Sequence, residues 1–113
     1  MAVNDLRQVV LTEDLFVVKP GANETSATFI FGNEDHTLGN VLRYTLMRRT
    51  ETEFCGYSVP HPYEPKMNVR LQTTGDPAVE VLKKGLQNVE EAANIMDDTF
   101  AAALAEYRQE SRR

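Results

Sequence analysis

Apolar and polar residues alternate with a period of two in several short stretches of this chain. The run LFVV at residues 15–18 is apolar, and the segment KPGANE after it holds the turn residues Pro20, Gly21 and Asn23. The stretch TSATFIF at residues 25–31 then resumes the alternation. The two runs therefore predict a β-hairpin with a connection of about five residues.

Two later stretches show the same short period. EFCGYSV at 53–59 is strand-like, and MNVRLQT at 67–73 places Met67, Val69 and Leu71 on one face, which we expect to be buried. The segment PHPYEP between them is rich in proline, which removes backbone donors and holds the chain extended. We expect two strands joined by a stiff connector.

Between these two pairs of strands the period changes to that of a helix. The apolar face repeats at i, i+3, i+4, i+7 and i+8, and its members are Leu38, Val41, Leu42, Thr45 and Leu46. Asp35 or Thr37 can cap this helix, because each offers an oxygen to a free backbone N–H. The acidic residues Glu34 and Asp35 also suit the positive end of the helix dipole.

The last third of the chain carries an uninterrupted apolar stripe. Its heptad spacing predicts one long helix, with Asp76 as N-cap, Pro77 as the first helical residue and no proline to interrupt residues 78–110. Such a helix is about 50 Å long, whereas a compact domain of this size is about 35 Å across. We expect part of the stripe to project and to need cover; the alternative is that all of it packs on the chain's own sheet. The stripe consists of Val79, Leu82, Leu86, Val89, Ala93, Met96, Phe100, Ala103 and Tyr107.

The order of elements is thus β-β-α-β-β-α. This order predicts an α+β two-layer sandwich: a four-stranded antiparallel sheet with two helices on one face, the C-terminal helix being long. Residues 14–110 are expected to form the single domain, with residues 1–13 as a flexible lead-in and residues 111–113 as an exposed end.

Composition narrows the class of function. The chain has 113 residues and a net charge of -5, which disfavours direct binding of nucleic acid. Its one cysteine, Cys55, cannot form an intrachain disulfide, and a reducing intracellular compartment fits best. No apolar run is long enough for a signal peptide or a membrane-spanning helix, so we expect a soluble protein with no membrane contact.

Few residues suggest a catalytic or metal-binding site. Glu34, Asp35 and His36 could orient a general base or bind a metal, but adjacent residues rarely converge on one atom, and a capped helix entry is the favoured interpretation. His36, Cys55 and His61 could form a three-ligand metal site, although nothing in their spacing predicts it. A structural connector at His61 and a buried, inert Cys55 are the favoured alternatives. We therefore expect no catalytic residue, metal or cofactor.

Glycine and arginine residues mark the faces of the two helices. Gly39 and Gly85 lie inside helical patterns, where each costs about 1 kcal/mol of helix stability relative to alanine. One explanation is close packing against another element, and the other is a tolerated neutral residue.

Arg43, Arg48 and Arg49 give the first helix a basic edge, which could touch a phosphate. The favoured reading is a solvated face with favourable charge near the helix C-terminus.

Three blocks of sequence carry a family likeness: NEDHTLGNVLRYTLM, FCGYSVPHPYEP and MNVRLQTTGDPAVEVLKKGL. Together they resemble the small alpha-like subunits of cellular RNA polymerases, and within that family the type shared by eukaryotic polymerases I and III. The likeness covers about residues 13–108. Family members are non-catalytic, and their fold agrees with the element order above.

The resemblance implies a function in assembly. It implies that the chain heterodimerises with a larger alpha-like subunit, and that this pair is the platform on which the second-largest and other polymerase subunits assemble in the nucleus, including the nucleolus. Together with the exposed stripe, it places the interface on both helices. The expected interface residues are His36, Leu38, Gly39, Val41, Leu42, Thr45, Leu46, Val89, Ala93, Met96, Phe100, Leu104 and Tyr107.

The sequence leaves three alternative functions. The equivalent subunits of polymerase II and of archaeal polymerase share the same blocks. From other classes, a small enzyme of pterin-dehydratase-like topology would need several histidines around one pocket, and a nucleic-acid-binding module would need positive charge. The chain has only His36 and His61, and it is acidic.

Overall fold

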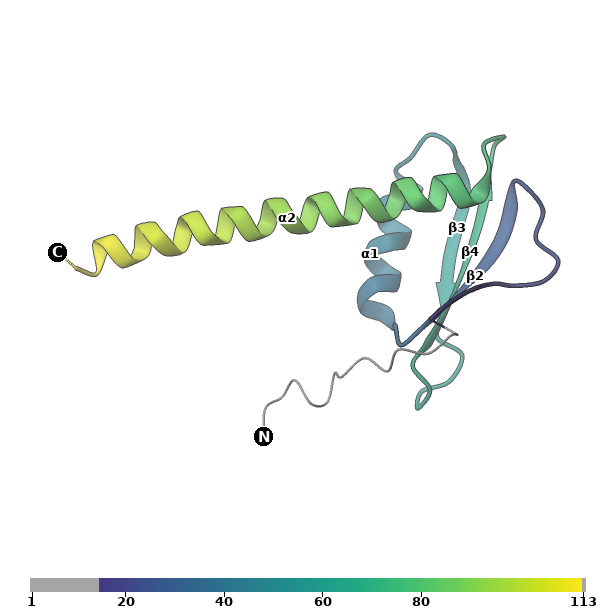
Figure 1. The fold of residues 1–113 in the computed structure, drawn as a ribbon, viewed down its shortest axis with the longest axis horizontal. Coiled ribbons are helices and arrows are strands. Elements are labelled where there is room, and N and C mark those ends of the chain that lie inside the picture. Colours follow the sequence, from purple (N-terminus) through teal and green to yellow (C-terminus); the bar gives the residue numbers. More distant parts are fainter. Residues whose placement is uncertain (1–14, 113) are drawn as a thin grey trace.

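The computed structural model describes residues 15–112, which form one antiparallel sheet and two helices (Figure 1). The strand order is β1-β2-β4-β3, so β1 and β3 are the edges. Both helices pack on one face of this sheet, and the predicted α+β two-layer fold is confirmed. The elements are β1 Phe16–Val18, β2 Ser26–Gly32, α1 His36–Met47, β3 Thr52–Ser58, β4 Lys66–Thr73 and α2 Ala78–Glu110.

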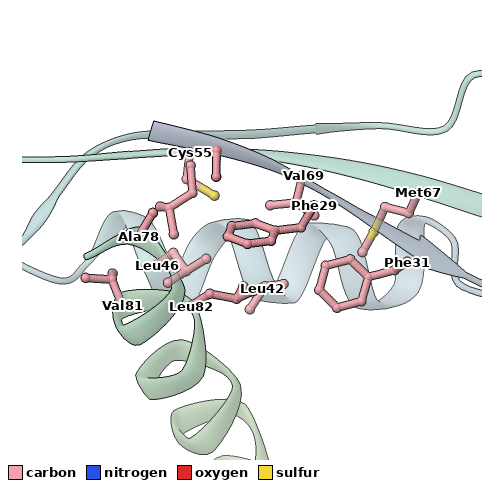
Figure 2. Close-up of a cluster of buried hydrophobic side chains, with 12 residues drawn as sticks. Phe29, Phe31, Leu42, Leu46, Cys55, Met67, Val69, Ala78, Val81 and Leu82 are labelled. Carbon is pink, nitrogen blue, oxygen red and sulfur yellow. The ribbon is translucent and has the colours of Figure 1, made fainter. Parts of the chain in front are cut away.

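The core lies between the sheet and the two helices (Figure 2). Alternate residues of β2 and β4 point into it, which confirms the inward face predicted for residues 67–73. Phe29 of β2 pairs in register with Val69 of β4, and both are covered by Leu42 and Leu46 of α1. The buried residues are Ala27, Phe29, Phe31, Leu42, Leu46, Cys55, Met67, Val69, Leu71, Ala78, Val81 and Leu82.

The first hairpin has a longer connection than the five residues expected. It spans residues 19–25, because Asn23 forms a further bridge with Ser26 and its side-chain oxygen accepts a hydrogen bond from the Thr25 N–H at 3.1 Å. Gly21 has a φ of 95°, which glycine adopts without strain. The connection thus contains a small turn of its own.

The two helices begin differently. Asp35 caps α1, since its carboxylate accepts the Thr37 N–H at 2.9 Å, which confirms one of the two predicted caps. The expected start of α2 is wrong: Pro77 holds the N-cap position with an extended ψ of 129°, and the helix begins at Ala78. The Ala78 N–H instead donates to the Glu24 carbonyl at 2.7 Å, so the β1–β2 connection satisfies this end of the helix.

The buried side of α2 is rotated from the predicted stripe at its N-terminal end. Val79 is 53% exposed, whereas Ala78 and Val81 are buried. Both sets of positions step by three and four along the sequence, so spacing alone could not separate them. From Leu82 to Val89 the predicted stripe lies on the side of α2 that packs against the core.

Both helical glycines lie at close contacts, as one of the two explanations predicted. A Cβ on Gly39 would lie 2.5 Å from Tyr57 Cδ2 and 2.7 Å from Met67 Sδ. A Cβ on Gly85 would overlap the side chain of Leu46, where α2 crosses α1. The neighbours that approach these glycines belong to the same chain, and the crossing of the two helices depends on the absence of a side chain at residue 85.

Gly85→Ala is expected to destabilise the fold. The added methyl group has no room beside Leu46, and overpacking of this kind costs about 1–3 kcal/mol, more than the gain in helix propensity. Gly75→Ala is the control, because a Cβ at that position meets nothing within 4 Å. Urea unfolding followed by circular dichroism should show a lower midpoint for Gly85→Ala alone; equal midpoints would contradict the tight crossing.

Cys55 is expected to be unreactive in the folded chain. Burial raises the pKa of its thiol from 9.0 to about 11, with a smaller opposing effect from Arg43. Because the folded pKa is the higher one, the contribution of the neutral thiol to stability is complete below pH 9.0 and is lost as pH rises toward 11. Labelling by a thiol reagent at pH 8 should be slow in buffer and complete in denaturant; fast labelling of the native chain would contradict the burial.

Candidate partner-docking surface

Helix α2 extends far beyond the sheet on which it begins (Figure 1). It has 33 residues, and from Glu90 to Arg112 every residue is exposed except the half-buried Leu104. We call residues 90–110 the arm. Its exposed apolar side chains include Met96, Phe100 and Tyr107, which are 71%, 64% and 67% exposed. The expected projection of the stripe is therefore confirmed.

Most polar residues of the arm lie off the stripe, together with Ile95 and several alanines. Acidic residues and Asn94 separate the apolar positions, and neither helix in residues 15–112 has the length and apolarity needed to cross a membrane. The arm is an amphipathic helix whose apolar stripe has no cover from the part of the chain that the structure describes.

A groove opens where the arm leaves α1. It has a volume of about 390 Å³, and apolar side chains from both helices form its lining. Glu34 lies at its polar rim, where burial and, to a smaller extent, the neighbouring charge of Asp35 raise the pKa of the Glu34 carboxyl. The groove leads directly onto the arm and can accept an apolar side chain from another molecule. Its lining residues are Asn33, Glu34, Asp35, Thr37, Leu38, Val41, Val89, Ala92, Ala93 and Met96.

The three polar residues at the start of α1 make different contacts. Asp35 caps the helix, Glu34 lines the groove, and His36 Nδ1 lies 3.0 Å from the Tyr57 hydroxyl. The rings of His36 and Tyr57 also meet edge to face at 5.5 Å. This arrangement holds the N-terminal end of α1 against β3, as the favoured interpretation of a capped helix entry predicted.

The alternative metal site is not formed by these side chains. Cys55 lies in the core, whereas His36 and His61 are exposed. Within residues 15–112, no group of three or more histidine, cysteine or acidic side chains is arranged to hold a metal ion. The three-ligand metal site considered from the sequence is therefore absent from residues 15–112.

The predicted interface residues divide into two groups. Gly39, Leu42 and Leu46 are buried in the chain's own core, so their assignment to an interface was wrong. Gly39, Leu42 and Leu46 share one apolar face of α1 with the half-buried Leu38 and Thr45. Only one side of this face is turned away from the core. Every other predicted member is exposed or half-buried, and its contact with a partner stays a prediction: these are His36, Leu38, Val41, Thr45, Val89, Ala93, Met96, Phe100, Leu104 and Tyr107.

Sequence reasoning placed Val41 at the interface but missed Tyr44, which forms a second outward face of α1 with it. Val41 and Tyr44 are 48% and 61% exposed and lie one helical turn apart, and Arg48 follows one turn later. The Arg48 guanidinium donates to the Tyr44 hydroxyl at 2.9 Å and lies 5.3 Å from its ring centre. The spacing i, i+3, i+7 of these residues is the signal that could have identified this outward face.

Arg49, which follows the C-terminal end of α1, differs from Arg43 and Arg48. Its guanidinium donates to Asn88 Oδ1 of α2 at 2.6 Å and pairs with Glu51 at 2.8 Å, and its side chain is only 24% exposed. The hydrogen bond from Arg49 also holds the pKa of the Glu51 carboxyl below its ordinary value. The expected solvated position is therefore wrong for Arg49, which ties α1 to α2 near the start of the arm.

Comparison with known proteins assigns the family. Residues 26–99 match the model of the RNA polymerase Rpb3/Rpb11 dimerisation domain, from β2 well into the arm. This chain belongs to that family. The resemblance stated from the sequence is thereby confirmed, because the matched segment contains β2, α1, β3, β4 and the first two thirds of α2.

Named relatives are similar over most of their length. DNA-directed RNA polymerases I and III subunit RPAC2 of Danio rerio is 46% identical over 91 residues, which cover 80% of this chain and 81% of that protein. The subunit of the same name from Schizosaccharomyces pombe is 48% identical, with 78% and 73% covered. The fold also matches the crystal structure of DNA-directed RNA polymerase subunit L from Thermoplasma acidophilum at a TM-score of 0.70 and 15% identity, over 83% of this chain and 92% of that one.

Arg49→Ala is expected to loosen the joint between the helices. It removes hydrogen bonds from a charged group to Asn88 and Glu51, a loss of about 1–3 kcal/mol in the free energy of unfolding. Arg43→Ala is the matched control, because Arg43 bonds to Asn40 within α1, and it should change stability by less than about 0.5 kcal/mol. Equal effects in urea unfolding would mean that Arg49 does not join the helices.

Proposed function

We propose that this chain is a non-catalytic assembly subunit of RNA polymerases I and III. It heterodimerises with the larger alpha-like subunit, and the pair is the platform for the large catalytic subunits. It thereby takes part in the transcription of ribosomal RNA, 5S RNA and transfer RNA, in the nucleus including the nucleolus. The relatives named as subunits of these two polymerases, at 46% and 48% identity, support this choice over the counterparts in polymerase II and in archaea.

The exposed stripe of the arm is the observation that carries the proposal. Its heptad spacing is that of one helix packed against another, and the stripe continues the buried face of α2 without a break. Burial of one large apolar side chain stabilises a complex by about 1.5–3 kcal/mol. Burial of Met96, Phe100 and Tyr107 together would therefore favour association.

The groove and the outward face of α1 extend this surface. Val41 of α1 and Met96 of the arm both line the groove, so a partner helix lying on the arm also reaches α1. Tyr44, held by Arg48, adds an aromatic anchor of the kind enriched in interfaces. The proposed interface thus runs from α1 along the arm and has an apolar centre with polar edges.

Other classes of function have less support. A pterin-dehydratase-like enzyme needs histidines around one pocket, whereas His36 contacts Tyr57 and does not line the groove. A nucleic-acid-binding module needs positive charge, and the arm is acidic. The proposal therefore assigns no catalytic residue to this chain and little or no direct contact with nucleic acid.

Phe100→Asp is expected to weaken binding to the larger alpha-like subunit. It places a charge at the middle of the apolar stripe, and the loss of one central anchor costs about 2–4 kcal/mol of association. The affinity of purified chains, measured by isothermal titration calorimetry, checks this result.

Ile95→Asp is the matched control. Ile95 is 66% exposed, close to the 64% of Phe100, but it lies off the stripe on the same helix. The control should bind nearly as well as the unchanged chain. Undiminished binding by Phe100→Asp, or an equal loss for both variants, would contradict the proposed interface.

A further inference from the structure

The net charge of this chain lies entirely in the arm. Residues 90–110 contain six acidic residues and one basic residue, a net charge of -5. The remainder of the chain contains 11 acidic and 11 basic residues and is neutral. Since the charge and the uncovered apolar stripe occupy the same segment, whatever covers the stripe also meets this charge.

The acidic residues have defined positions around the helix. With Ala93 and Phe100 at heptad position a, and Met96 and Ala103 at position d, Glu90 and Asp97 fall at position e. Glu106 falls at position g, on the other edge of the stripe. Positions e and g flank a helix–helix seam, and their charges determine which helices can pair.

Within residues 15–112, these flanking carboxylates form no ion pair. Glu90, Asp97 and Glu106 are exposed, and the ion pairs within residues 15–112 join Arg49 to Glu51 and Lys66 to Glu64. No Lys or Arg of the arm occupies a flanking position, because Arg108 lies at position b. The seam is therefore bordered by negative charge on both edges.

We infer that the helix received by the arm carries lysine or arginine at the positions that face Glu90, Asp97 and Glu106, and that the same acidic residues prevent two copies of this chain from pairing. This inference rests on the proposed function and specifies the chemistry of its partner. The apolar stripe attracts any apolar helix, including its own copy. The flanking charges select between the two, because opposite charges across a seam attract and like charges repel.

Two double variants distinguish the effect of the charges that flank the seam from the effect of the total charge of the chain. Glu90→Lys/Asp97→Lys reverses position e, whereas Glu91→Lys/Asp98→Lys reverses adjacent exposed residues at position f, on the side away from the stripe. Both change the net charge of the chain by the same amount. Circular dichroism of each variant verifies that the helix is retained.

The first measurement is the affinity of each chain for the larger alpha-like subunit. The flanking variant should bind roughly tenfold more weakly and the control less than about twofold more weakly. Raising the salt concentration from about 0.05 M to about 0.5 M should weaken binding by the unchanged chain, because screening reduces attraction between opposite charges. Equal effects of the two variants would overturn the inference and leave the proposed function standing. A wild-type chain that fails to bind at any salt would overturn both.

The second measurement needs no partner. Sedimentation equilibrium of Glu90→Gln/Asp97→Asn/Glu106→Gln should show self-association at least roughly tenfold tighter than that of the unchanged chain. Added salt should strengthen self-association of the unchanged chain, opposite in sign to its effect on the heterodimer, since it screens repulsion. Self-association unaffected by neutralisation or by salt would overturn the exclusion of a second copy.

Discussion

Helix α2 carries one apolar stripe but has a sheet beneath only its first part. The stripe runs from the buried Leu82 through the half-buried Leu86 and Val89 into the exposed positions Met96 and Phe100. A helix that packs on a core at one end only has an exposed apolar stripe at the other end. It is stable in water only if its polar residues compensate for this exposure or a second surface covers the stripe. The rest of the molecule is arranged to present this arm in one direction.

That direction is set by the crossing of the two helices. Gly85 brings α2 against Leu46, and Arg49 spans from the end of α1 to Asn88. Asp35 and the contact between His36 and Tyr57 hold the other end of α1 on the sheet. A partner therefore meets two helices whose relative position is fixed before binding, which reduces the entropy lost on association. The small core thus serves as the base from which the arm projects.

The sequence was sufficient to predict the fold and the exposed stripe. Apolar residues repeat every two positions in the strands and every three to four in the helices, and this difference is clear over segments of these lengths. It could not assign Leu42 and Leu46 to the core rather than to an interface, since α1 is apolar toward its own sheet and toward the outside. The role of Arg49 was also hidden, because it depends on Asn88, which is distant in the chain. Contacts of this kind follow from the angle at which the helices cross, and no local pattern encodes that angle.

Hydrogen exchange of the backbone amides of the arm tests most directly whether a second chain covers it. Exchange is measured for the free chain and for its complex with the larger alpha-like subunit, with the amides of β4 as an internal reference. A covered seam predicts that exchange in residues 93–107 slows by about tenfold or more in the complex, while β4, already protected by its neighbours on both sides, changes little. Equal exchange in the arm of the free and the bound chain would contradict the docking of a partner on this helix.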